Sequence, residues 1–258
     1  MKAYTAFVTP TGNEASYFVA DDWSAVARKH NAEMLGQPLH VITNDSPGYK
    51  TMLAAASVAG GDCWTFRTLA SYLAAREFAE SDGPDDELFI WLDADLIVNP
   101  LWPTREWLSR RGVMVATQVE HLRTVHEHYK VDYMARHLGI DKSMWFQILT
   151  SLMLLERGHL RTILNALHEG GYDLFDPSVW EKIATGYDLT TYPHSRFYSD
   201  QAFEFAYLLA GIAPQSVMDL ASWVSYDAVW DNKPLIHFDG SNKTRLPGWL
   251  DGFGTTKT

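Results

Sequence analysis

Short apolar runs alternate with longer stretches of helical periodicity along the first half of the chain. Runs of about four to eight apolar and β-branched residues predict strands, and apolar positions at helical spacing predict helices. We expect strands at residues 3–9, 39–43, 87–93, 113–119 and 151–156, and helices near 17–35, 66–80, 159–169 and 198–211. Strands that alternate with helices predict βαβ units, and therefore an α/β fold with a mostly parallel central sheet flanked by helices.

Two segments interrupt this alternation. The acidic run ESDGPDDE at 80–87 contains Gly83 and a proline and directly precedes a strand, so we interpret it as a solvated turn rather than a metal site. The segment 121–137 is rich in histidine and cations. Its His126 and His128 would lie on different faces of a helix, which favours a surface helix or a lid over a metal site.

The last predicted helix has clear ends. Ser199 or Asp200 provides its N-cap, and Gly211 provides its C-terminal stop. No repeat, low-complexity segment or linker divides the chain, so we expect a single domain with one shared core.

Composition and charge exclude several classes of function. The net charge of −11 argues against a nucleic-acid partner, because phosphate binding needs a basic surface. The single cysteine, Cys63, excludes an intramolecular disulfide and a cysteine-rich zinc site, and it fits a reducing compartment. No window approaches the roughly 18 continuous apolar residues of a membrane span, and the first residues lack the apolar region of a secretory signal. We therefore expect a cytoplasmic protein with no integral membrane segment.

The stretch FIWLDADLIVNP at 89–100 places two carboxylates inside an apolar run. An unpaired buried carboxylate is costly, so a partner is expected. In a strand, Asp93 and Asp95 would point to the same side, and Asn99 and Pro100 end the run near the carboxyl end of the sheet, where α/β sheets bind ligands. Two oxygen donors there suit Mn²⁺ or Mg²⁺, which could hold a diphosphate. The structural alternative is a pair of aspartates that caps the following loop.

One enzyme class with an Asp-x-Asp strand end is the haloacid-dehalogenase-like phosphatases. There the first aspartate is the nucleophile and the second is the acid/base. That motif lies near the chain start and continues with a small residue, whereas Leu96 and Ile97 follow Asp95 here. The phosphatase pattern therefore fits poorly.

A second enzyme class is indicated by a pattern that extends along the chain. It consists of FVTPTGNEASY at 7–17, FIWLDADLIV at 89–98, SDQAFEF at 199–205 and LIHFDGSNK at 235–243. Together these segments resemble the glycogenin-like glycosyltransferases, commonly called family 8, which include bacterial lipopolysaccharide galactosyltransferases. The resemblance implies one GT-A catalytic domain over 1–258, with a nucleotide-sugar-binding half at 1–118 and an acceptor-side half at 119–258.

The resemblance also implies which residues bind the donor. Asp93, Asp95 and His237 would hold Mn²⁺ or Mg²⁺, with His237 supplying a neutral imidazole nitrogen. Gly240 lets the backbone approach a phosphate closely, and Lys243 offers a positive charge to the same diphosphate. The other donor contacts that the family pattern implies are Thr9, Thr11, Tyr17 and Arg67. Taken alone, a histidine that follows a strand is more often structural.

Catalysis is assigned by the same resemblance to the start of the last predicted helix. Gln201 would face the anomeric carbon, and Asp200 would hold donor hydroxyls or stabilise an oxocarbenium-like transition state, with retention of configuration. As an alternative, Asp200 is simply a helix cap that the dipole favours.

The chain departs from the family pattern at two places. The family follows its lysine directly with Pro-Trp, whereas here Pro247 and Trp249 come several residues after Lys243, which predicts a shifted C-terminal loop. Thr150 and Ser151 stand where the family has Asn-x-Gly, which leaves the donor sugar open.

The expected function is transfer of a hexose from a nucleoside-diphosphate sugar, with a UDP-sugar as expected donor, to a hydroxyl of a glycan, lipid-linked or other acceptor. The segment 119–145 is expected to select the acceptor. The alternative from another class is a non-catalytic sugar-nucleotide-binding protein, which would need no intact metal set. Because the full set is present, we favour an enzyme, and this requires that His237 lies close to Asp93 and Asp95 in space.

Overall fold

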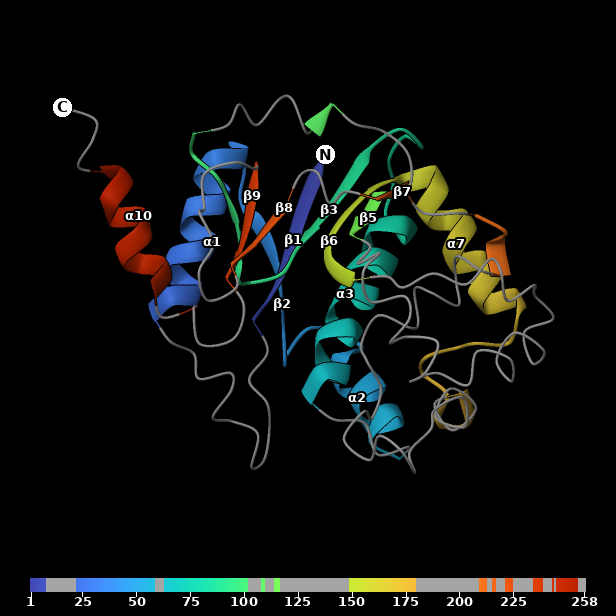
Figure 1. Ribbon diagram of the computed structural model, residues 1–258. Helices are drawn as coiled ribbons and strands as arrows, with labels where there is room; N and C mark the ends of the chain where they lie inside the picture. The colour runs from blue at the N-terminus through green and yellow to red at the C-terminus, as the bar shows by residue number, and fades with distance from the viewer. Residues whose placement is uncertain are drawn as a thin grey trace, which may run out of the picture.

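The computed structural model describes residues 1–7, 22–58, 63–101, 108–109, 114–116, 149–179, 209–212, 215–216, 221–224, 234–238, 243 and 245–254. Their strands form two sheets, and helices lie on both sides of these sheets (Figure 1). None of the helices in these ranges combines the length and the apolar character that crossing a membrane requires.

The larger sheet contains six strands in the described ranges. In spatial order they are β2 (Leu39–Thr43), β1 (Lys2–Phe7), β3 (Leu88–Leu92), β6 (Leu149–Glu156), β5 (Met114–Ala116) and β7 (Gln215–Ser216). β1 pairs in parallel with β2 and β3, and β5 pairs in parallel with β7. Only β6, among these six, runs antiparallel to its neighbours β3 and β5. The predicted mostly parallel α/β sheet is confirmed.

A smaller sheet begins directly after β3. It consists of β4 (Leu96–Val98), β9 (Leu235–Phe238) and β8 (Ala221–Val224), in the order β4-β9-β8. β9 is antiparallel to β4 and parallel to β8. We expected Asp93 and Asp95 to lie within one continuous strand, and this expectation is wrong. The chain leaves the large sheet after Leu92 and enters the small sheet at Leu96.

Helices cover both faces of the large sheet. They are α2 (Tyr49–Val58), α3 (Cys63–Glu80) and α7 (Arg157–Glu169) on one side, and α1 (Asp22–Leu35) and α10 (Leu246–Gly254) on the other, beyond the small sheet (Figure 1). In β3, Phe89 and Trp91 belong to the core cluster that contains α3 and α7. Ile90 and Leu92 belong to the cluster with α1 and the small sheet. Since both faces of β3 are covered, its sequence is apolar throughout rather than alternating.

Helix α10 lies where we expected a shifted loop. Leu246 is fully buried in a third core cluster with Ile236 of β9 and Ala27 of α1. The ring of Trp249 stands 5.6 Å from the ring of Phe238, in an edge-on arrangement. The apolar face of the segment after Lys243 therefore packs as a helix against the small sheet.

The predicted helices agree with the structure where it describes them. α3 begins a few residues before the expected position and ends at Glu80 as expected. α7 begins at Arg157, before the expected His159, and ends at Glu169 as expected. Helix α2 was not expected. In the last predicted helix, Leu209 and Ala210 are helical, and Gly211 follows with a φ of 65°, the left-handed conformation that ends helices. The start of that helix lies outside the described residues.

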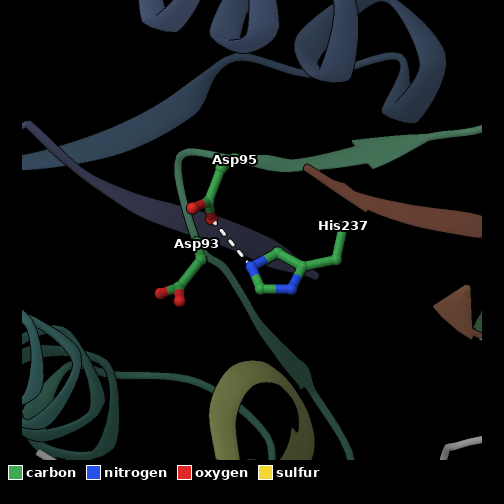
Figure 2. A group of neighbouring side chains, drawn as sticks. All are labelled: Asp93, Asp95 and His237. Carbon is green, nitrogen blue, oxygen red and sulfur yellow. Dashed lines mark hydrogen bonds and ion pairs between the residues drawn. The ribbon is translucent and has the colours of Figure 1, made fainter. Parts of the chain in front are cut away.

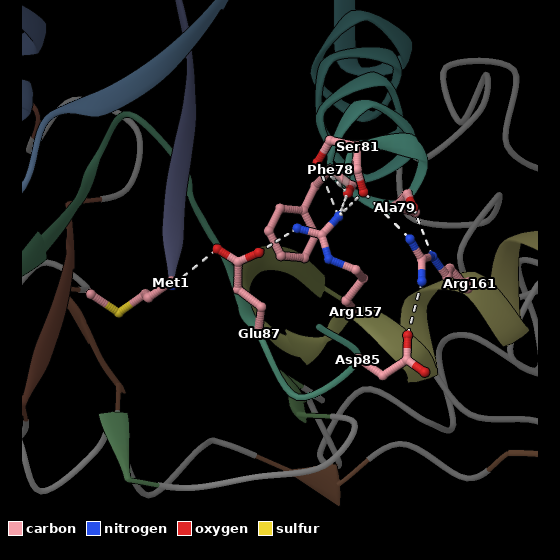
Figure 3. A network of polar contacts seen from close by, with 8 residues as sticks. All are labelled: Met1, Phe78, Ala79, Ser81, Asp85, Glu87, Arg157 and Arg161. Carbon is pink, nitrogen blue, oxygen red and sulfur yellow. Dashed lines mark hydrogen bonds and ion pairs between the residues drawn. The ribbon is translucent and has the colours of Figure 1, made fainter. Parts of the chain in front are cut away.

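The acidic run after α3 is a solvated turn, as predicted, with one exception. Asp82, Asp85 and Asp86 are exposed, whereas Glu87 forms an ion pair with Arg157, which is fully buried (Figure 3). The guanidinium of Arg157 also donates to the carbonyl oxygens of Phe78 and Ser81, and it stacks 3.9 Å from the centre of the Phe78 ring. This arginine therefore fixes the end of α3 to the beginning of α7.

Candidate metal centre

Asp93 and Asp95 lie in a turn that joins the two sheets. The N–H of Leu96 donates to the carbonyl oxygen of Asp93 at 3.0 Å, which closes the turn between β3 and β4. Asp93 is half-buried, and Asp95 is only 1% exposed. The shared orientation of the two carboxylates therefore comes from a turn rather than from the i, i+2 geometry of a strand.

Strand β9 brings His237 to this turn. In the β4–β9 ladder His237 is paired with Leu96, the residue after Asp95. The next N–H of β9, that of Phe238, donates to the carbonyl oxygen of Asp95 at 2.9 Å. His237 therefore comes from the far end of the sequence and yet lies beside the turn because of backbone pairing.

The three predicted ligands lie together (Figure 2). One ligand atom from each of Asp93, Asp95 and His237 lies within 4.8 Å of the others. His237 Nε2 is 3.2 Å from Asp95 Oδ1, and His237 is 6% exposed. The expected approach of His237 to both carboxylates is confirmed. That these atoms bind a metal stays a prediction.

One separation in this group, between Asp95 and His237, matches that expected around a single divalent cation. Mn²⁺ and Mg²⁺ bind oxygen and imidazole donors at about 2.1 Å, so two neighbouring ligands on one ion lie about 3 Å apart. The 3.2 Å between His237 Nε2 and Asp95 Oδ1 is close to that value. Two carboxylates and one imidazole are also hard and intermediate donors of the kind that these ions accept.

Lys243 reaches the same carboxylate from α10's leading segment. Its Nζ is 2.8 Å from Asp95 Oδ2, and its side chain is 14% exposed. The ammonium also lies 5.6 Å from the centre of the Trp23 ring on α1. Lys243, which we predicted to bind the diphosphate, thus lies at the site. It forms an ion pair there with Asp95, one of the predicted metal ligands.

Two further residues position the turn and were missed by sequence reasoning. Trp91 is fully buried, and its indole N–H donates to Asp93 Oδ1 at 3.1 Å. Asn31 of α1 is 2% exposed, and its amide donates to the carbonyl oxygen of Leu96 at 2.8 Å and accepts from the N–H of Val98 at 2.9 Å. Asn31 thereby satisfies the edge of β4 as a neighbouring strand would. An asparagine on an apolar helix face, where it is unfavourable, is the signal that could have identified it.

His30 adds a second contact from α1 to β4. Its Nε2 lies 2.7 Å from the carbonyl oxygen of Val98. Burial lowers the pKa of His30 below its ordinary value, so the imidazole is neutral at neutral pH and donates its N–H to that carbonyl. Together with Asn31, this residue fixes α1 beside the strand that follows the turn.

The other predicted site residues lie outside the described residues. They are Thr9, Thr11, Tyr17, Asp200, Gln201 and Gly240. Arg67 lies in α3, but its side chain is also outside what the structure describes. The predicted acceptor segment 119–145 lies outside as well. Their roles stay predictions.

Comparisons with known proteins identify similar solved structures only. No protein-family model and no curated protein matches the chain. Galactosyltransferase LgtC, solved with donor and acceptor sugar analogs, is 13% identical, with 100% of this chain and 97% of that chain covered and a TM-score of 0.48. A glycosyltransferase involved in glycosylation of the major capsid of PBCV-1 is 12% identical, with 97% and 100% covered and a TM-score of 0.44. Mouse xyloside xylosyltransferase 1, in its apo form, is 10% identical, with 94% and 98% covered and a TM-score of 0.48.

Proposed function

We propose that this protein is a metal-dependent glycosyltransferase that moves a hexose from a nucleoside-diphosphate sugar to a hydroxyl acceptor. A UDP-sugar is the proposed donor, and a glycan, a lipid-linked glycan or another hydroxyl compound is the proposed acceptor. The sequence resemblance to the glycogenin-like family supports this class of reaction. It also supports one catalytic domain, with the donor half at 1–118 and the acceptor half at 119–258.

One observation carries the proposal. Asp93, Asp95 and His237 come from two segments that are separated by more than a hundred residues, and yet their ligand atoms lie within 4.8 Å of one another. Asp95 and His237 are almost completely buried there. Two carboxylates and an imidazole that converge in this way are expected where a cation is bound, because the cation compensates for their burial.

The residues at the turn would bind the donor through its diphosphate. Asp93, Asp95 and His237 would hold Mn²⁺ or Mg²⁺, which would supply positive charge to the phosphate oxygens. Trp91 orients the Asp93 carboxylate through its indole N–H. Lys243 supplies a second positive charge within reach of the same centre. Positive charge at this place stabilises the departing nucleoside diphosphate, which is the main electrostatic demand of glycosyl transfer.

Sugar transfer itself is assigned to residues known only from the sequence. We propose that Gln201 faces the anomeric carbon and that Asp200 binds donor hydroxyls, with retention of configuration. Thr9, Thr11 and Tyr17 would contact the nucleoside, while Arg67 and Gly240 would contact the sugar nucleotide and its diphosphate. The resemblance supports each of these roles at its matched position.

The test is release of nucleoside diphosphate from a panel of UDP-, GDP- and CMP-sugars, with and without Mn²⁺. We expect metal-dependent release, slow in the absence of an acceptor. Asp95→Asn should abolish the metal-dependent part of turnover, because a ligand charge is lost. Circular dichroism and thermal melting of the variant establish whether it folds.

Asp82→Asn is the matched control, because Asp82 is an exposed aspartate of the acidic turn. It should keep full activity. Unchanged turnover in Asp95→Asn would remove Asp95 from the metal site. If UDP stabilises the protein only with Mn²⁺ but no sugar nucleotide is cleaved, the protein is the non-catalytic binding module.

A further inference from the structure

The carboxylate of Asp95 is held by cationic or hydrogen-bonding groups at both of its oxygens. Lys243 Nζ lies 2.8 Å from Oδ2, and His237 Nε2 lies 3.2 Å from Oδ1. Asp95 is 1% exposed, so these contacts replace the water that a free carboxylate would bind. Lys243 therefore supplies positive charge to a buried carboxylate.

We propose that Lys243 is an exchangeable counter-ion of Asp95: a divalent cation displaces its ammonium from the carboxylate, and the released ammonium then binds the diphosphate. This inference rests on the proposed function, because it concerns the same metal and diphosphate site. Only the ion-pair partner of the ammonium changes. Lys243 thereby positions the Asp95 carboxylate before the cation binds, and it binds the diphosphate of the sugar donor afterwards.

The charges at the site explain why exchange is favourable. The carboxylates of Asp93 and Asp95 and the ammonium of Lys243 sum to one net negative charge. A divalent cation added to this group would make the net charge positive, and the ammonium and the cation would repel each other at short range. A diphosphate offsets that repulsion, because its negatively charged oxygens accept hydrogen bonds from the ammonium and also bind the cation.

The surroundings of Lys243 allow it to change partners. Its side chain is 14% exposed, whereas that of Asp95 is 1% exposed. The Trp23 ring, 5.6 Å from Nζ, offers a face that attracts a cation without a fixed hydrogen bond. Rotation of the long side chain can therefore carry the ammonium away from Asp95 while it stays beside the site.

Exchange couples the two ligands. A cation that binds alone must displace the ammonium, so Lys243 weakens cation binding. Once the cation is bound, the same residue strengthens diphosphate binding. Lys243→Met should therefore raise the affinity for the cation and lower the affinity for the diphosphate. If Lys243 only bound phosphate, the substitution would lower the affinity for the diphosphate alone.

Calorimetric titration of the full chain with Mn²⁺ alone, and with inorganic pyrophosphate in saturating Mn²⁺, tests this coupling. For Lys243→Met we expect Mn²⁺ affinity to rise by at least about fivefold, the lower end of usual coupling between two ligands. We expect pyrophosphate affinity to fall by about tenfold, which corresponds to the loss of one charge-assisted hydrogen bond. Lys50→Met is the matched control, because Lys50 forms an exposed pair with Asp45 at 3.1 Å, and it should change neither affinity.

A measurement on the wild-type protein covers the case in which Lys243→Met does not fold. Amine-reactive labelling read by mass spectrometry should show increased modification of Lys243 when Mn²⁺ binds, and renewed protection when pyrophosphate is added. Lys50 should show no such change.

The outcomes separate this inference from the proposed function. Mn²⁺ that binds with equal affinity to the wild type and to Lys243→Met overturns the exchange and leaves the metal site intact. So does Mn²⁺ binding with unchanged labelling of Lys243. Absence of Mn²⁺ binding in both proteins overturns the metal site, and with it both proposals.

Discussion

At the scale of single residues, Asn31 shows how a buried polar side chain can position the Asp93–Asp95 turn without contributing a ligand atom to it. Its amide provides the donor and the acceptor that β4 lacks on its α1 side. Both contacts are made with the backbone of the strand that begins one residue after Asp95. The position of Asp95 therefore depends on Asn31. The hydrogen bonds of Asn31 described above go to Leu96 and Val98, not to Asp95 or His237.

Asn31→Ala should destabilise the protein by about 2–6 kcal/mol, because a buried carbonyl and a buried N–H of β4 each lose their partner at about 1–3 kcal/mol. Urea unfolding measures this change in the free energy of unfolding. The variant should also bind Mn²⁺ more weakly, because β4 is no longer fixed beside α1.

Asn165→Ala on α7 is the control for this variant, because Asn165 is exposed. It should lie within about 0.5 kcal/mol of the wild type. Equal stability of Asn31→Ala and Asn165→Ala would show that water replaces the Asn31 amide at β4.

At the scale of elements, α3 and α7 are joined at their ends by two arginines of different exposure. Arg157 is fully buried and binds Glu87 and the end of α3, whereas Arg161 is 41% exposed and binds Asp85 at 2.9 Å (Figure 3). At Gly83 in the turn between them, a Cβ atom would lie 2.7 Å from Arg157 Nη2, so a side chain there would require the ends of the Glu87 and Arg157 side chains to shift. The acidic turn is thus solvated on its outside and tightly packed on its inside.

Arg157→Met should cost about 3–5 kcal/mol, since removal of this buried guanidinium leaves the carbonyl oxygens of Phe78 and Ser81 without their donor and leaves Glu87 with only the N-terminal ammonium of Met1. Arg161→Met is the matched comparison in the same turn and should cost about 1 kcal/mol or less. Urea unfolding of both variants checks the difference. Similar losses in the two variants would mean that burial of Arg157 does not determine its contribution.

The same ion pair should make stability depend on pH. The hydrogen bond from Arg157 lowers the pKa of Glu87 below its ordinary value of 4.5. Because the unfolded chain then binds the proton more readily than the folded one, the stabilisation is complete above about pH 4.5 and is lost as the pH falls through the lowered pKa. The stability difference between wild type and Glu87→Gln, measured by urea unfolding, should therefore shrink on acidification from pH 6 to about pH 3. A difference that stays constant over this range would contradict the assignment.

At the scale of the whole molecule, the sequence predicts the sheet better than it predicts where the chain changes sheets. β3 and β6 could be recognised because both faces of Leu88–Leu92 and of Leu152–Leu155 are buried, which makes these two runs apolar throughout. The break at Asp93–Asp95 could not be recognised in this way. Leu92 and Leu96 are both buried, and the partner that draws Leu96 into the small sheet is His237, far along the chain.

The sequence also predicted part of the candidate site, namely its three proposed metal ligands, but not the residues that position them. Resemblance identified His237 as a partner of the two aspartates, whereas its spacing in the sequence carries no such information. Local pattern marks Asn31 only as a polar residue on an apolar helix face, and it does not indicate what Asn31 or Arg157 contacts, because a polar residue on a helix usually faces solvent. Only the backbone groups that they satisfy, on segments distant in sequence, explain their burial.

The turn at Asp93–Asp95 has a consequence for folding as well as for chemistry. Asp95 and His237 are 142 residues apart in sequence, so an ion shared between them would act as a cross-link across more than half of the chain. Such a link opposes every opening motion that separates β4 from β9. The free energy of ion binding is therefore added to the free energy that is needed to open this pair of strands. Occupancy by its cofactor would then set how long this protein survives proteolysis, in addition to whether it turns over.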